Sequence, residues 1–195
     1  MSDLAFLDFQ ALVERAVSDP AAEAEAHRRF GTVAAVLVVD FTGMVRRTDA
    51  RGIVYALGRA QVAQRALGLG GTRVKRVADT LFVVYPSAEA ALLDALDAVK
   101  RLHAAEAGHP DPVHPCIGLG HGECLLIPGV DVFGAEVNRA FVLGEDVAEG
   151  GEVLATPAFL AALGGLPPGV GTFDAPAERV AEAGFGFRVI RDFRG

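Results

Sequence analysis

Residues 131–140 read DVFGAEVNRA, in which an aspartate, an aromatic residue and a glycine lead into a helical stretch that runs to about Glu149. Two shorter segments come before it. The segment DFTGM, residues 40–44, follows the apolar run 33–39, and the segment KRVAD, residues 75–79, lies between two strand-like apolar stretches. Each segment carries a carboxylate beside an apolar element, which is a poor pattern for a core and favours a site.

Asp40 and Asp79 are the candidate metal ligands. Asp40 ends an apolar strand and opens onto a tight turn, while Asp79 lies between two strands. Hard divalent cations such as Mg²⁺ prefer carboxylate oxygens together with substrate phosphates, so two strand-end aspartates are about the minimum for metal-assisted phosphate chemistry. On this pattern alone, a role as simple turn formers stays open, because aspartate is common in turns.

Read in order, the three segments resemble the catalytic domain of the class III adenylyl/guanylyl cyclases. Its D-[FI]-x-G-[FM] element is similar to residues 40–44, its K-x-x-[GA]-D element to 75–79, and its D-x-[FWY]-G-x-x-V-N-x-A element to 131–140. Order and spacing agree from residue 31 to residue 160, and the run GLGHG at 118–122 matches a strand of the family. Three motifs in order are far more specific than any one of them.

The resemblance implies a first half-site that handles metal and phosphate. Asp40 and Asp79 would hold two Mg²⁺ or Mn²⁺ ions, one acting on the attacking ribose 3′-hydroxyl and the other on the triphosphate. The backbone of the turn that follows Asp40 would cradle the phosphates. Its residues are Phe41, Thr42, Gly43 and Met44.

The resemblance implies a second half-site that reads the nucleotide. Lys75 and Asp131 would recognise the purine edge, where a donor and an acceptor suit adenine and therefore favour ATP. Asn138 would be the catalytic residue that orients the ribose. In the family the two half-sites come from different protomers, so a chain that carries both is expected to work as a homodimer that forms cyclic AMP for signal transduction.

One position departs from the family pattern. The family has an arginine four residues after the asparagine, and Val142 stands there in this chain. Loss of a positioned cation lowers the rate of phosphoryl-transfer enzymes by about 10³- to 10⁵-fold. Arg139 points about 100° away from Asn138 on a helix. Arg46 and Arg47, just past the first metal element, are the nearest candidates to compensate.

Two functions therefore stay open. The first is a nucleotidyl cyclase that makes cyclic AMP, slowly. The second is an inactive pseudo-cyclase that serves as a nucleotide-binding or dimerising signalling module. A diguanylate cyclase is excluded, because the Gly-Gly-Asp/Glu-Glu-Phe element of that class is absent from the sequence.

Composition limits the partners and the location. The 195 residues are 51% hydrophobic and 22% charged, which suits one well-buried domain. The net charge of -7 argues against binding to nucleic acid. No apolar run reaches the roughly 18 residues of a membrane span, and no signal-peptide pattern starts the chain. Two cysteines make no disulfide framework, so a cytoplasmic location is expected.

The order of predicted elements is the ferredoxin-like βαββαβ motif of an α+β fold. Strands are expected at 32–39, 72–77, 80–85 and 115–126, with helices at 48–67 and 86–107. Residues 144–146 are expected to form a solvent-facing acidic helix, and residues 164–184 a long loop before a last strand at 185–190.

Residues 1–30 are expected to form an N-terminal helical extension, and residues 31–195 the nucleotidyl cyclase-like domain. In the first helix Leu4, Leu7, Val13 and Val17 fall near helical spacing, and Phe6 and Phe9 widen this apolar stripe. That stripe would bind a partner or a second copy, or pack on its own domain.

Overall fold

The computed structural model describes residues 2–194, with side chains from residue 4 onward. Four strands form one side of the sheet in the order β2-β3-β1-β4, with β2 at the edge, and all three of their pairings are antiparallel. They span Gly31–Phe41 (β1), Thr72–Val77 (β2), Thr80–Tyr85 (β3) and Pro115–Ile127 (β4). The predicted α+β fold with a ferredoxin-like core is confirmed.

Four more strands extend the sheet beyond β4. β6 (Val153–Ala155) pairs with β4 in parallel, β8 (Arg188–Asp192) and β7 (Val170–Asp174) follow it, and β5 (Asp131–Phe133) pairs with the far end of β4. The prediction of a loop over 164–184 was wrong, because this segment contains β7 and the helix α8 (Ala177–Ala183). β7 is held by its pairing with β8, a contact between distant residues that local composition does not reveal.

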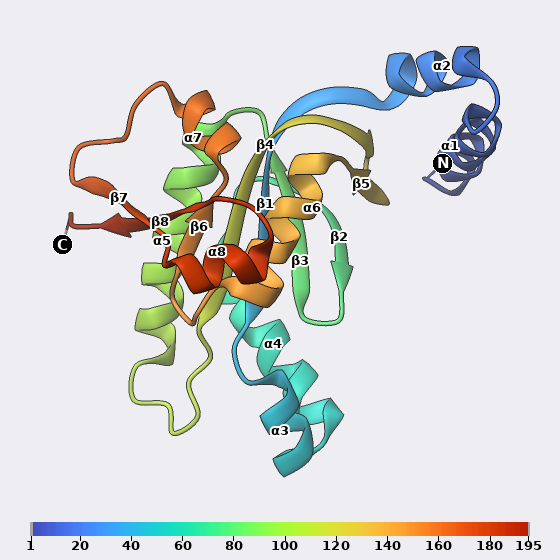
Figure 1. Cartoon of the computed structure of the whole chain (residues 1–195). Helices are drawn as coiled ribbons and strands as arrows, with labels where there is room; N and C mark the ends of the chain where they lie inside the picture. The colour runs from blue at the N-terminus through green and yellow to red at the C-terminus, as the bar shows by residue number, and fades with distance from the viewer. Residues whose placement is uncertain (1, 195) are drawn as a thin grey trace.

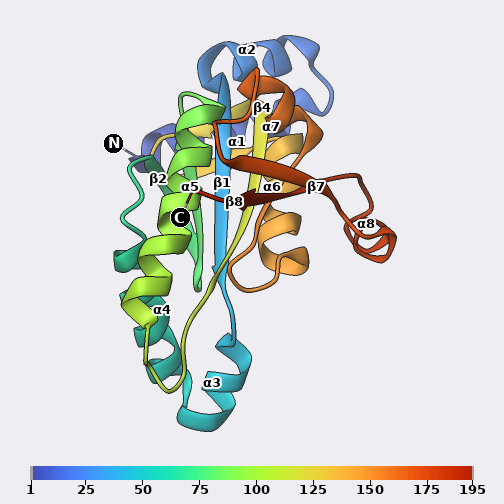
Figure 2. The same ribbon diagram turned by 90° about the vertical axis from the view of Figure 1, so that its left-hand side faces the viewer.

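Helices cover both faces of the sheet (Figure 2). On one face lie α4 (Ile53–Leu67), α5 (Ala88–Glu106) and α7 (Pro157–Leu163), over a core that includes Leu37 and Val39 of β1. On the other face lies α6 (Ala135–Val142), which continues as a π-helical segment, η1 (Leu143–Val147). There it covers the alternate β1 residues Val36 and Val38. The apolar run of β1 is uninterrupted because both of its faces are buried.

The helix predicted at 48–67 is two helices. α3 (Met44–Arg51) starts directly after the turn that follows β1, and Gly52 separates it from α4 with a backbone φ of +86°. This left-handed conformation suits glycine and interrupts the helix. α3 therefore lies at the end of β1 rather than over the sheet (Figure 1).

The backbone of α6 lies directly on β4. A Cβ atom on Gly118 would overlap the carbonyl oxygen of Ala140, and one on Gly120 would overlap that of Glu136. The glycine-rich run of β4 therefore sets how closely α6 approaches the sheet, because any side chain there would push the helix outward.

The N-terminal helices α1 (Ser2–Ala16) and α2 (Pro20–Phe30) form a separate pair at one end of the sheet (Figure 1). Phe9 anchors them, with its ring stacked 5.3 Å from that of Phe133 and edge-on to Phe30. The predicted apolar stripe is buried only in part: its Phe9 is buried, together with Leu12. Four other residues of the stripe are exposed: Leu4, Leu7, Val13 and Val17.

The division of the chain at residue 30 stays a prediction.

Among residues 2–194, no helix combines the length and the apolar character that crossing a membrane would require.

The turn between β2 and β3 carries local strain. Ala78 has a backbone φ of +51°, a conformation that costs a residue with a Cβ about 1–2 kcal/mol. Its side chain is exposed. We expect Ala78→Gly to stabilise the fold by about 1 kcal/mol and to raise Tm by about 2–4 °C in thermal unfolding.

The matched control is Ala104→Gly, at an exposed position within α5. There the same change should lower stability by about 1 kcal/mol, because glycine is a poor helix former. A loss of stability in both variants would contradict the strained turn.

Candidate functional site

Asp40 and Asp79 lie together at one end of the sheet. Asp40 is near the end of β1, Asp79 is in the β2–β3 turn, and the pairing of Val39 with Leu81 sets these two chain segments side by side. Both open into a cleft of about 1030 Å³. Its other charged lining residues are Arg46, Asp49 and Glu145.

The pKa values of Asp40 and Asp79 are raised above the usual range of aspartate. Burial, followed by repulsion from Asp79 and Glu145, raises the pKa of Asp40 to about 7. Burial also raises the pKa of Asp79, and hydrogen bonds from its own backbone and to the Asp40 carboxyl group partly offset this rise. Carboxylates this close favour keeping a proton until a cation neutralises them.

Glu145 is a member of the site that the sequence did not reveal. It is exposed as expected, but toward the cleft that holds Asp40 and Asp79. The hydroxyl of Thr80 lies 2.6 Å from Glu145 Oε2 and 3.2 Å from Asp40 Oδ1, so it bridges the two side chains. Glu145 belongs to η1, where the N–H of Ala148 donates to the carbonyl of Leu143 at 2.8 Å. Such a π-helical turn redirects the side chains that follow α6.

Gln64 of α4 holds the turn that carries Asp79. Its side-chain amide is buried and donates to the carbonyl of Asp79 at 2.8 Å. This bond fixes the turn from the face of the sheet opposite α6. An isolated glutamine in a helix gives no sequence signal for such a role.

The turn at 41–44 is tied to the rest of the fold through Thr42. The N–H of Thr42 donates to the carbonyl of His114 at 3.0 Å, its hydroxyl accepts from the N–H of His114, and its carbonyl accepts from Arg47. Gly43 takes the left-handed conformation, with φ +81°, just before α3 begins. The backbone N–H of Thr42 is thus used by the fold, and the phosphate-cradling role of residues 41–44 stays a prediction.

Lys75 and Asp131 form an ion pair outside the cleft. Lys75 Nζ lies 2.6 Å from Asp131 Oδ1, across β2 and β5, and it also lies 4.5 Å from the centre of the Phe82 ring. Both side chains are about a quarter exposed. The structure therefore brings together the donor and the acceptor that the sequence placed 56 positions apart.

Asn138 lies exposed on α6, whose Phe141 stacks on Phe82 with ring centres 5.8 Å apart. The lining of the Asp40 cleft includes none of Lys75, Asp131 and Asn138. Within one chain, the proposed nucleotide-reading residues thus lie outside the cleft that holds the proposed metal residues.

Val142 is half-buried and packs against an apolar cluster. The cluster contains Leu143, Val147, Leu154, Phe187 and Val189, with Val180 and Phe185 at its edge. The position at which the family has its arginine therefore belongs, in this chain, to the packing of α6 against the C-terminal segment.

The donor set of the cleft fits a hard divalent cation. In residues 2–194, no group of three or more His, Cys, Asp and Glu side chains forms a complete metal cage. Two carboxylates, completed by water and by substrate phosphates, are nevertheless what Mg²⁺ typically binds. Asp40 and Asp79 would hold the metal there, and Glu145 lies beside them, linked to Asp40 by the hydroxyl of Thr80.

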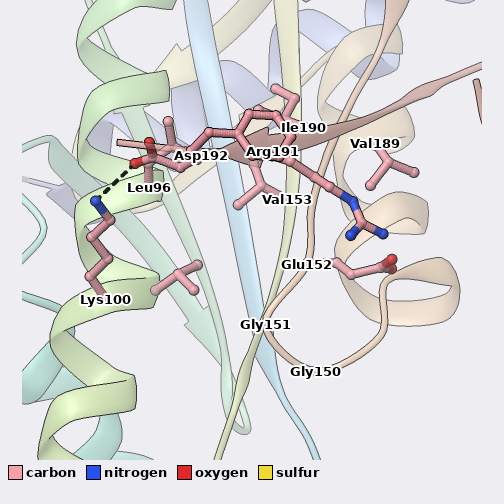
Figure 3. A pocket seen from close by; sticks show the side chains of 12 residues that line it. Leu96, Lys100, Gly150, Gly151, Glu152, Val153, Val189, Ile190, Arg191 and Asp192 are labelled. Carbon is pink, nitrogen blue, oxygen red and sulfur yellow. Dashed lines mark ion pairs between the residues drawn. The ribbon is translucent and has the colours of Figure 1, made fainter. Parts of the chain in front are cut away.

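A second cavity, of about 440 Å³, lies between α5 and β8 (Figure 3). Lys100 and Asp192 form an ion pair of 3.2 Å across it. Asp192 also binds Arg194, and both groups are thus engaged within the fold. We assign this cavity no role.

Among the comparisons with known proteins, the one with solved structures supports the fold. No protein-family model matches the sequence, and neither does any curated protein. An adenylate/guanylate cyclase/hydrolase from Silicibacter pomeroyi superposes with a TM-score of 0.69 at 24% identity, over 85% of this chain and 98% of that one.

Two further structures are similar. One is a non-canonical dimeric guanylyl cyclase domain of the RhoGC fusion protein from Blastocladiella emersonii (TM-score 0.62, 16% identity, 82% of this chain and 96% of that one). The other is the catalytic core of a rhodopsin-guanylyl cyclase with converted specificity, in complex with ATPαS (TM-score 0.60, 15% identity, 83% and 98%). This chain has the fold of these cyclase catalytic domains.

The raised pKa of Asp40 predicts how stability depends on pH without metal. Between pH 4 and pH 7 the folded state keeps a proton that the unfolded state releases, so this contribution to stability is lost as the pH rises through 7. Asp40→Asn removes the titration. We expect Asp40→Asn to melt above wild type by about 2–4 °C at pH 8 in EDTA and close to wild type at pH 4.

Asp146→Asn is the control, because Asp146 is an exposed carboxylate that does not line the cleft. If the melting temperatures of wild type and Asp40→Asn run parallel from pH 4 to pH 8, the carboxyl cluster does not strain the fold.

Proposed function

Because the chain has the fold of class III cyclase catalytic domains, we propose that it is a nucleotidyl cyclase domain that binds ATP with two Mg²⁺ or Mn²⁺ ions and forms cyclic AMP. The observation that carries the proposal is the pair of Asp40 and Asp79 in one cleft, with a pKa of about 7 for Asp40. Buried carboxylates that repel one another form a site that gains stability when a cation binds.

The metal half of the site consists of Asp40, Asp79 and the turn 41–44. When bound, the ions lower the pKa of the ribose 3′-hydroxyl and neutralise the triphosphate. Asp40 and Asp79 hold the ions at the end of β1, and Gly43 and Met44 offer backbone N–H groups at the start of α3, where a helix has donors without intrahelical partners.

The nucleotide-reading half consists of Lys75, Asp131 and Asn138. The ammonium of Lys75 and the carboxylate of Asp131 present a donor and an acceptor side by side, which matches the edge of adenine. Asn138, exposed on α6, orients the ribose. The two halves are separate within one chain, which supports a symmetric homodimer in which each site takes one half from each protomer.

An inactive nucleotide-binding module is the second candidate. The observation that favours it is the half-buried Val142, which offers no charge to the transition state and is held in an apolar cluster. The two candidates share the binding site and differ in turnover.

The first test is incubation of the protein with Mn²⁺ and each of ATP, GTP, CTP and UTP, with chromatography of the products. We expect cyclic AMP from ATP. Asp40→Ala should abolish Mn²⁺-dependent ATP binding while the protein stays folded, because the change removes a ligand and a repulsive charge together. Binding is measured by calorimetry, and Asp146→Ala is the control.

The outcomes separate the models. Binding of Mn²⁺-ATP without any cyclic product identifies the inactive module. An unchanged affinity for Mn²⁺-ATP in Asp40→Ala removes Asp40 from the metal site.

The composite site is tested by mixing two defective variants. Asp40→Ala lacks the metal half and Lys75→Met lacks the nucleotide-reading half, so neither homodimer has an intact site. In an equal mixture that exchanges subunits, half of the dimers are mixed and each has one intact site of two, which restores about a quarter of the ATP-binding sites. Recovery of no sites in a mixture shown to contain mixed dimers would contradict the two-protomer site.

A further inference from the structure

We propose that Arg46 binds the triphosphate and supplies the cation that position 142 lacks. This inference rests on the proposed function, and it concerns the metal half of the site. Two neighbouring arginines follow the turn at 41–44, and the structure gives them different roles.

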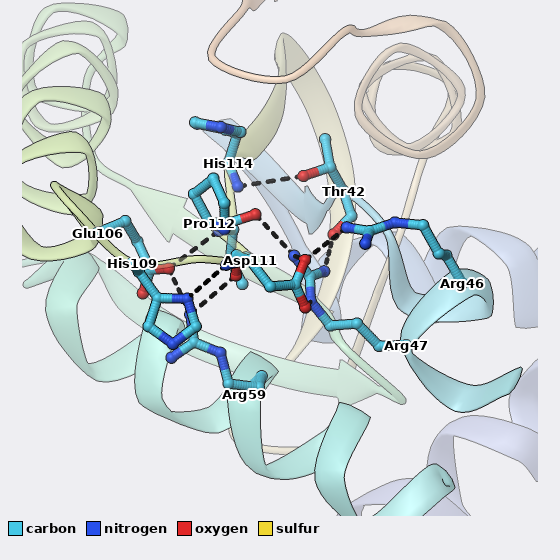
Figure 4. A network of polar contacts seen from close by, with 10 residues as sticks. Thr42, Arg46, Arg47, Arg59, Glu106, His109, Asp111, Pro112 and His114 are labelled. Atoms are coloured by element: carbon cyan, nitrogen blue, oxygen red, sulfur yellow. Dashed lines mark hydrogen bonds and ion pairs between the residues drawn. The ribbon is translucent and has the colours of Figure 1, made fainter. Parts of the chain in front are cut away.

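Arg47 is part of the fold. Its side chain is 3% exposed, and it donates to the carbonyls of Thr42 and Pro112 and to both carboxylate oxygens of Asp111 (Figure 4). A guanidinium with this many buried partners is not released without leaving several polar groups unpaired. Arg47 therefore fixes the turn and does not reach a ligand.

Arg46 is held much more loosely. Its side chain is 67% exposed, and its one ion pair joins Nη2 to Asp111 Oδ1 at 2.5 Å. Arg47 already binds both oxygens of Asp111. Arg46 can thus leave without unpairing that carboxylate, and an exposed ion pair of this kind contributes at most about 1 kcal/mol.

Arg46 also lies beside the turn that is proposed to bind the phosphates. It lines the cleft with Asp40 and Asp79, and among the described residues that line this cleft it is the one arginine or lysine. Its Nη2 lies 3.3 Å from the point where a Cβ on Gly43 would stand. The guanidinium therefore lies over the turn that is proposed to cradle the phosphates.

The negative charge of the cleft creates a need for a cation that offsets repulsion of the triphosphate. Its lining carries four carboxylates, from Asp40, Asp49, Asp79 and Glu145, and a triphosphate would add further negative charge. A guanidinium binds phosphate oxygens through two parallel hydrogen bonds, which combine charge with geometry. Val142 cannot provide this contact, so the first helix after β1 provides it from the metal half instead.

The test compares nucleotides that differ only in phosphate number. Affinities of Mn²⁺-ATP and of AMP with Mn²⁺ are measured by calorimetry for wild type, Arg46→Gln and Arg46→Lys. We expect Arg46→Gln to weaken ATP binding by about 10- to 100-fold, the loss of one hydrogen-bonded charge, and to leave AMP binding unchanged. Arg46→Lys should recover part of the loss, because it keeps the charge without the planar fork.

Arg51→Gln is the matched control. Arg51 lies on the same helix with its guanidinium over the ring of Tyr55, outside the cleft, so its loss changes the net charge by the same amount. ATP affinity should stay at the wild-type value in this variant. Arg46→Gln should also melt within about 1 °C of wild type, since the lost ion pair is exposed.

Two results would contradict the role of Arg46 and leave the proposed function intact. One is an ATP affinity in Arg46→Gln equal to that of wild type, and the other is an equal loss for ATP and AMP. Failure of the proposed function gives a different result. In that case wild type itself shows no Mn²⁺-dependent binding of ATP, so the role of Arg46 in binding the triphosphate fails with it.

Discussion

The direct contact between the backbone of α6 and β4 is the constraint on which the site depends. Gly118 and Gly120 carry no side chain where the carbonyls of α6 meet the strand. This close approach sets the height of Asn138 above the sheet. It also sets the position of η1, which brings Glu145 to Thr80 and Asp40. A side chain at either glycine would lift the helix and separate the groups that form the cleft.

The paired carboxyl groups of the cleft lower the free energy of unfolding of the protein when no ligand is bound. Asp40 and Asp79 are partly buried beside one another, and the pKa of Asp40 rises to about 7 as a result. Bonds around the cleft hold these groups in place, including the one from Gln64 to the carbonyl of Asp79. Repulsion that a bound cation relieves is typical of functional sites, where pKa values are shifted by burial and by like charges.

Arg46 and Arg47 show how neighbouring residues of one type are separated by geometry. Both lie on the first turns of α3, and both contact Asp111. Successive residues of a helix point about 100° apart, so one side chain enters the protein while the other faces the cleft. The buried one fixes the turn, and the exposed one is available to a ligand.

The sequence by itself determined the βαββαβ part of the fold and named the candidate site residues. Strand-length apolar runs, a tight hairpin and three ordered motifs predicted the strands β1 to β4 and the candidate pair of aspartates. The resemblance to the cyclase family implied that Lys75 and Asp131 act together, and the structure places them 2.6 Å apart.

Only the tertiary structure decided which residues surround those groups. Glu145 faces the cleft because a π-helical turn redirects it, Gln64 reaches Asp79 from another helix, and β7 forms because β8 is there to pair with it. In α1, Phe9 is buried because the ring of Phe133 stacks on it, whereas Leu4 and Leu7 of the same apolar stripe are exposed. Each of these depends on contacts between residues far apart in the chain, and the free energy of such contacts leaves no periodic pattern in the sequence.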